Sequence, residues 1–88
     1  MKTVDIIISG RVQGVGFRYH TLKTALEFNI KGFVKNLPDG SVFVKATGNQ
    51  TDLESFLLWC NQGPRLAMVE KLDIKETNFS PFDEFTIR

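Results

Sequence analysis

The sequence has little of several residue types that would place it in well-defined classes of protein. Its one cysteine, Cys60, cannot form a disulfide within the chain, so a cytoplasmic location is expected. No apolar run approaches the roughly 18 residues that a membrane span needs, so no membrane contact is expected. The 11 lysines and arginines face 10 acidic residues, and the net charge of +1 argues against non-specific nucleic-acid binding. The one histidine, His20, has no companion at metal-ligand spacing, so no metal is expected.

What is present is the composition of a globular protein with one modest core. The chain has 88 residues, of which 42% are hydrophobic and 24% charged, as in ordinary globular domains. A chain of this size buries roughly 60–65% of the surface that its unfolded form exposes. It shows no linker, internal repeat or low-complexity segment. We therefore expect a single domain over residues 1–88, and nothing in the sequence demands more than a monomer.

Alternating apolar residues and turn signals predict the order of the secondary-structure elements. Val4, Ile6 and Ile8 alternate with other residues, as in a half-buried strand rather than a signal peptide. Asp39 and Gly40 lie between two β-rich runs, which is a hairpin signal. The predicted strands cover residues 3–10, 31–37, 41–48, 68–77 and 83–88, and the predicted helices cover 20–30 and 51–62. This order predicts an α+β, ferredoxin-like βαββαβ sandwich with a short extra C-terminal strand and two helices on one face of a mainly antiparallel sheet.

Each predicted helix carries apolar residues at helical spacing. In the first helix, with His20 or Thr21 as its cap, the predicted core face comprises Leu22, Ala25, Leu26 and Ile30. In the second helix, with Thr51 and Glu54 as a capping box, it comprises Leu53, Phe56, Leu57 and Cys60.

A glycine-bearing loop separates the first strand from the first helix. Residues 10–18 read GRVQGVGFR, with the loop expected over residues 11–18. Glycines let the backbone adopt positive φ, so that successive N–H groups can face one anion, and a helix N-terminus adds partial positive charge. The guanidinium of Arg18 matches two phosphate oxygens. The loop lacks the third glycine of a dinucleotide fingerprint and the lysine of a P-loop, which excludes those two motifs. Its glycines alone fit a structural turn as well as an anion site, and the position of Arg18 at the helix entrance favours a site for a small phosphate or carboxylate.

Asn36 stands at the end of the predicted second strand, just before the hairpin turn. An asparagine there often makes turn hydrogen bonds, but its carboxamide can also hold a water by donating and accepting at once. From the residues alone, both roles stay open.

Two stretches, in the right order and at the right spacing, resemble the two signatures of the acylphosphatase family. The first is residues 10–18, and the second is residues 32–42, GFVKNLPDGSV, continuing to Gly48. Residues 63–64, 67–69 and 85–88 are also similar to the family's pattern, so the resemblance covers nearly the whole chain. It does not extend to residues 19–21, and the roles of Tyr19 and His20 near the site stay open.

The resemblance implies an enzyme that hydrolyses small acyl phosphates to carboxylate and inorganic phosphate, with no metal, no cofactor and no phosphoenzyme. Arg18 matches the family's phosphate-binding arginine, and Asn36 matches its water-orienting asparagine. The loop that matches the phosphate cradle comprises Gln13, Gly14, Val15, Gly16, Phe17 and Arg18. The expected ligands are an acyl phosphate and inorganic phosphate, the latter as product and competitor.

Three alternatives stay open. A non-catalytic ferredoxin-like module would bind a small anion without turnover. An RNA-binding module is suggested by residues 31–34, KGFV, which are similar to part of the RNP1 consensus, with Phe33 or Phe43 on the open face, although the near-neutral charge argues against it. An acylphosphatase-like domain of a larger carbamoyl-transfer system is the third, but the short chain favours a free-standing enzyme.

Overall fold

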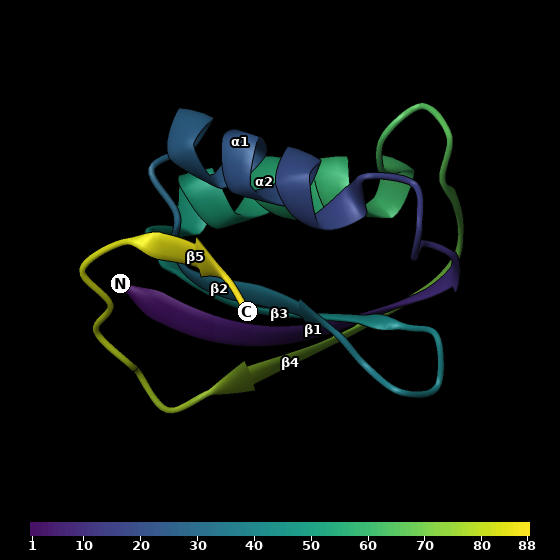
Figure 1. Cartoon of the computed structure of the whole chain (residues 1–88). Helices are drawn as coiled ribbons and strands as arrows, with labels where there is room; N and C mark the ends of the chain where they lie inside the picture. The colour runs from purple at the N-terminus through teal and green to yellow at the C-terminus, as the bar shows by residue number, and fades with distance from the viewer.

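Five strands and two helices follow one another in the predicted order. The computed structural model describes all 88 residues. The elements are β1 (Lys2–Arg11), α1 (Phe17–Glu27), β2 (Lys31–Asn36), β3 (Val42–Gly48), α2 (Gln50–Gln62), β4 (Met68–Thr77) and β5 (Phe85–Ile87). Both helices lie on one face of the sheet, and the other face carries no helix (Figure 1). The ferredoxin-like prediction is confirmed.

The sheet has the strand order β4-β1-β3-β2-β5. β1 pairs with β3 and β4, and β2 pairs with β3, all antiparallel, while the short β5 runs parallel to β2. The sheet is therefore mixed only at the edge that β5 adds. This edge places the C-terminal end of the chain beside β2, the strand that ends at Asn36.

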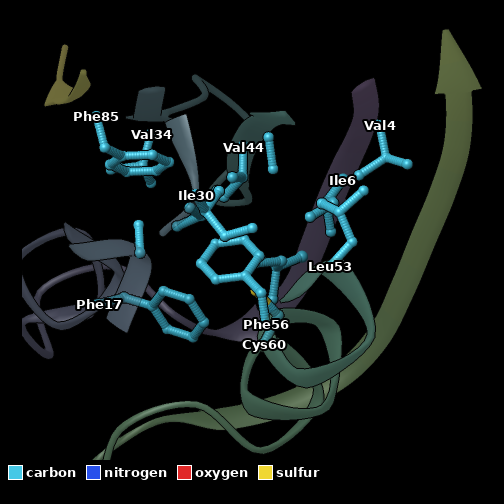
Figure 2. Close-up of a cluster of buried hydrophobic side chains, with 14 of the residues drawn as sticks. Val4, Ile6, Phe17, Ile30, Val34, Val44, Leu53, Phe56, Cys60 and Phe85 are labelled. Atoms are coloured by element: carbon cyan, nitrogen blue, oxygen red, sulfur yellow. The ribbon is translucent and has the colours of Figure 1, made fainter. Parts of the chain in front are cut away.

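The core lies between the helices and the two central strands. Val4, Ile6 and Ile8 of β1 pair in register with Ala46, Val44 and Val42 of β3, and all six side chains are buried. Because strand side chains alternate between faces, the intervening Ile7 points to the open face and is exposed. Figure 2 shows Val4, Ile6 and Val44 of these strands in one cluster with Phe17, Phe56 and Cys60 from the helices. The alternation predicted for the first strand is confirmed.

The first helix begins earlier than predicted, and one of its four predicted core residues is not in the core. It spans Phe17–Glu27 rather than 20–30, so neither His20 nor Thr21 caps it. Ala25 and Ile30 are buried and Leu22 is partly buried, as predicted, but Leu26 is 64% exposed. The buried residues are Phe17, Thr21, Thr24 and Ala25. The hydroxyl of Thr21 donates a hydrogen bond to the carbonyl of Phe17 at 2.7 Å, and that of Thr24 donates to the carbonyl of His20 at 2.8 Å. Because these hydroxyls are hydrogen-bonded, the two polar side chains can occupy core positions.

The second helix has the expected core face but a different cap. Leu53, Phe56 and Cys60 are buried, as the apolar spacing predicts, and Leu57 is half-buried. The cap is Asn49, whose Oδ1 accepts from the backbone N–H of Asp52 at 2.8 Å, rather than Thr51. The Glu54 carboxylate, predicted to take part in a capping box, accepts instead from the side-chain Nε2 of Gln50 at 3.0 Å.

Of the two rings predicted on the open face of the sheet, Phe33 is covered and Phe43 is half-buried. Phe33 is only 7% exposed, since Phe43 and Phe82 pack against it and the Arg88 guanidinium lies 3.9 Å from its ring centre. A covered ring offers no face for base stacking. Neither helix of the fold is long and apolar enough to cross a membrane.

Candidate active site

A pocket of about 250 Å³ lies where the β1–α1 loop meets the end of β2. These two segments are at the same end of the molecule, with the β2–β3 turn below the loop (Figure 1). The pocket is lined by Val12, Gly14, Gly16, Phe17, Arg18, Tyr19, Asn36 and Ile87. Arg18 and Asn36, 18 residues apart in sequence, thus contribute to one concave surface.

The glycines of the loop are required by its backbone conformation. Gly14 and Gly16 have φ values of 75° and 77°, in the left-handed region that other residues rarely adopt. A Cβ atom at either position would meet nothing within 4 Å, so the constraint is conformational rather than one of space. Gly16 is the N-cap of α1, and no side chain caps this helix. The residue immediately before the helix therefore turns the chain and leaves the helix terminus open.

Six successive backbone N–H groups, those of residues 14 to 19, have no hydrogen-bond acceptor in the protein. None of them donates in the turns, loops and caps, and none donates to a side chain. The last three belong to the first turn of α1, where N–H groups have no partner within the helix. Together with the helix dipole, such a row of donors favours a bound anion.

Arg18 is the second residue of α1 and lines the pocket. Its side chain is exposed, and none of the three ion pairs of the protein involves it. No aspartate or glutamate lines the pocket, and α1 has no acidic residue in its first turn. The guanidinium is therefore free to pair with an anionic ligand.

Asn36 is the last residue of β2 and lines the pocket from a different segment than the loop. It is half-buried, and its carboxamide makes no hydrogen bond to the protein. The turn after it is held by other groups, because Asp39 accepts from the Ser41 hydroxyl at 2.5 Å and from the Ser41 N–H at 2.9 Å. These bonds, that from the hydroxyl first, lower the pKa of Asp39. A role for the Asn36 side chain in the turn is thus excluded.

Two of the predicted cradle residues do not line the pocket. The Gln13 side chain points to the β2–β3 turn, where its Nε2 donates to the carbonyls of Leu37 and Ser41, both at 2.8 Å. Val15 packs, partly buried, against the hydrophobic core. Phe17 lines the pocket, but its ring is buried and packs 5.5 Å from the Trp59 ring, centre to centre. These side chains anchor the loop, whose backbone N–H groups have no acceptor in the protein.

The pocket also contains residues that sequence reasoning did not assign to it. Val12 and Ile87 were not predicted there, and Tyr19 was left open. Val12 and Tyr19 adjoin the glycine loop, so their proximity to it was a usable signal. Ile87 comes from β5, and only the parallel pairing of β5 with β2 brings it to the site. His20 lies outside this pocket, and the chain has no group of three or more histidine, cysteine, aspartate or glutamate side chains arranged to hold a metal ion.

The sandwich and its pocket define a class of protein: small ferredoxin-like domains with a cationic loop suited to a phosphoryl group. The acylphosphatase family model matches residues 4–87. The chain belongs to the acylphosphatase family. Members of this family are hydrolases that act on acid anhydrides, namely small acyl phosphates. Family and fold together support catalysis over the non-catalytic alternative.

Individual relatives agree with this assignment. The chain is 44% identical to an acylphosphatase of Archaeoglobus fulgidus over 87 residues, covering 99% of this chain and 98% of the relative. The crystal structure of acylphosphatase from Bacillus subtilis superposes with a TM-score of 0.97 at 35% identity, covering 100% and 99% of the two chains. HypF from T. kodakarensis also matches, with a TM-score of 0.83 and 38% identity over 99% of this chain but only 12% of the HypF chain. The fold therefore also occurs within longer proteins.

Proposed function

We propose that this pocket hydrolyses the carboxyl–phosphate bond of small acyl phosphates, with Arg18 binding the phosphate and Asn36 orienting the attacking water. The observation that carries the proposal is the convergence, in one pocket, of unpartnered N–H groups, an unpaired arginine and an unpaired carboxamide. Each of these groups is free to act on a ligand because no other part of the protein engages it.

The phosphate would lie against the loop. The N–H groups of residues 14 to 19 and the guanidinium of Arg18 would donate to its non-bridging oxygens. Phosphoryl transfer passes through a loose transition state that chiefly needs positioning and charge stabilisation. Donors that are already in place act without reorganising when charge develops on these oxygens.

The water would lie against Asn36. Its carboxamide oxygen would accept a hydrogen bond from the water and direct the water oxygen at phosphorus, in line with the leaving group. The oxygen–phosphorus bond forms as the bond from phosphorus to the acyl oxygen breaks, and the electron pair leaves on the carboxylate. No aspartate, glutamate or histidine lines the pocket, so the proton of the water passes to a phosphate oxygen of the substrate. A carboxylate is a good leaving group, so no acid is needed to protonate it.

The acyl group would meet an apolar and uncharged part of the pocket. Tyr19 and Ile87 line it and are 56% and 41% exposed, so a carbon substituent can rest on them while remaining partly in solvent. Arg18 is the only charged residue in the lining. The substrates are therefore acyl phosphates selected mainly through their phosphate, with inorganic phosphate as a competing ligand.

Residues 1–88 would form a single acylphosphatase-like domain, acting as a monomer in the cytoplasm. The one cysteine is compatible with a reducing compartment, and Cys60 is buried in the core. Sedimentation of the purified protein tests the monomer, and cell fractionation tests the location.

Steady-state kinetics with benzoyl phosphate test the activity. We expect saturable hydrolysis with competitive inhibition by inorganic phosphate. Phosphate binding without turnover would identify a non-catalytic anion-binding module, and turnover that phosphate does not inhibit would contradict the phosphate cradle.

A further inference from the structure

The two functional parts of the pocket come from segments that the sheet does not pair with each other. The antiparallel pairing of β1 with β3 ends at Ile8 and Val42, and beyond it β1 pairs only with β4. The glycine loop therefore extends past the last ladder contact with the β2–β3 hairpin. No backbone hydrogen bond outside the regular elements joins the loop to this hairpin. Something else has to set the separation between the loop and Asn36.

Gln13 makes the only side-chain hydrogen bonds across this gap. Its Nε2 donates to the carbonyl of Leu37 and to that of Ser41, each at 2.8 Å, so both of its N–H bonds are used. Carbonyl oxygens only accept, so the nitrogen end of the amide must face them. The residue is half-buried and does not line the pocket.

Both acceptors lie next to the Asn36–Val42 pair, on the side of the turn. Leu37 follows Asn36 directly in the chain, and Ser41 precedes Val42, which is the register partner of Asn36 on β3. The same two carbonyls also close the turn, because Leu37 N–H donates to Ser41 at 2.8 Å and Gly40 N–H donates to Leu37 at 3.2 Å. One amide therefore holds both ends of the turn that joins Asn36 to Val42.

We propose that Gln13 is a positioning residue that sets the distance between the phosphate-binding loop and the water held by Asn36. This inference rests on the proposed function and adds to it a residue that touches neither phosphate nor water. The loop residues Gly14 and Gly16 follow Gln13 directly, so a displacement of Gln13 moves the loop relative to Asn36. Misplacement of reacting groups by about 1 Å can cost on the order of 10²-fold in rate.

The inference predicts an effect on turnover rather than on phosphate binding. Gln13→Ala leaves the N–H groups and Arg18 in the loop, so the inhibition constant of inorganic phosphate should change less than about 3-fold. The kcat for benzoyl phosphate should fall by about 10- to 100-fold. A purely structural role would lower the denaturation midpoint but leave the kcat of the folded enzyme unchanged.

A double-mutant cycle with Asn36 provides the sharpest test. If Gln13 acts through Asn36, then Gln13→Ala should lower kcat by less than about 3-fold in an Asn36→Ala background, because the effects of groups that act as a unit do not add. Gln50→Ala is the matched control, because Gln50 also donates one side-chain hydrogen bond, to Glu54, but lies on α2 outside the pocket. Its kcat should equal that of the wild type.

The outcomes separate this inference from the proposed function. Equal losses from Gln13→Ala in both backgrounds, or no loss in the wild-type background, would overturn the positioning role while the hydrolysis stands. Absence of wild-type turnover would refute the proposed function and this role with it. If Gln13→Ala does not fold, Gln13→Asn replaces it, since an amide shortened by one methylene cannot reach both carbonyls. Wild-type kcat in Gln13→Asn would likewise overturn the inference.

Discussion

Replacement of Arg18 by alanine removes the one cation of the pocket. The guanidinium can make two charge-assisted hydrogen bonds to a phosphoryl group, and each such bond contributes about 1.5–3 kcal/mol. Arg18 is exposed, so water competes for these bonds and the low end of the range applies, which gives about 3 kcal/mol in total. Since about 1.4 kcal/mol corresponds to a factor of ten, kcat/KM should fall on the order of 10²-fold. This agrees with the roughly 10²- to 10³-fold loss caused by removing one oxyanion donor.

The assay measures kcat/KM for benzoyl phosphate together with the inhibition constant of inorganic phosphate. Both should weaken in Arg18→Ala, because in the proposed mechanism the arginine binds the phosphoryl group in ground and transition states alike. Arg18→Lys keeps the charge but loses the planar fork, so its activity should lie between those of Arg18→Ala and the wild type.

Lys75→Ala is the matched control, because it removes one exposed positive charge from β4, at the far edge of the sheet from β2. β4 and β2 are three strand spacings of about 4.8 Å apart, and this distance exceeds the Debye length of about 8 Å at physiological salt. Less than about 5-fold loss in Arg18→Ala, or an equal loss in Lys75→Ala, would refute the direct contact of Arg18 with phosphate.

Three further predictions concern water placement, the core and the hairpin turn. Asn36→Ala should lower kcat for a synthetic acyl phosphate with KM changed much less, and wild-type kcat would disprove the water-orienting role. Phe56→Ala should lower the free energy of unfolding by about 3–5 kcal/mol, because this side chain is fully buried against Phe85; urea denaturation measures it, and a loss below about 1 kcal/mol would contradict the packing. The pKa of Asp39 is lowered in the folded state by the hydrogen bonds from Ser41, so its stabilisation is present above the unfolded pKa of about 4 and is lost as pH falls through the lower folded value. Urea midpoints between pH 2 and 6 should therefore depend less on pH in Asp39→Asn, and identical profiles would count against this assignment.

Much of the fold follows from local patterns in the sequence. The alternation of Val4, Ile6 and Ile8 predicts a two-faced strand, and the register with β3 places these side chains in the core. Asp39 and Gly40 predict the hairpin because the turn demands a backbone that glycine supplies, with Gly40 at a φ of 95°. Arg18 could be selected because it follows a glycine loop at a strand–helix junction, whereas the role of Asn36 came only from the resemblance to the acylphosphatase family.

Features that the spacing of apolar residues does not encode could not be predicted. The buried face of α1 includes Thr21 and Thr24, whose hydroxyls are satisfied by the helix's own carbonyls, so a purely apolar stripe pointed to Leu26 instead. The acceptors of Gln13 lie 24 and 28 residues away, and only the folded hairpin brings them together. Ile87 reaches the pocket through a parallel pairing that no local pattern encodes.

Hydrolysis of benzoyl phosphate in the presence and absence of a chelator tests the central claim most directly. The account assigns phosphate binding to the loop and Arg18 and water placement to Asn36, with no step that needs a metal. It predicts the same kcat and KM before and after treatment with excess EDTA. Loss of activity on chelation, with recovery on adding back a divalent cation, would contradict it.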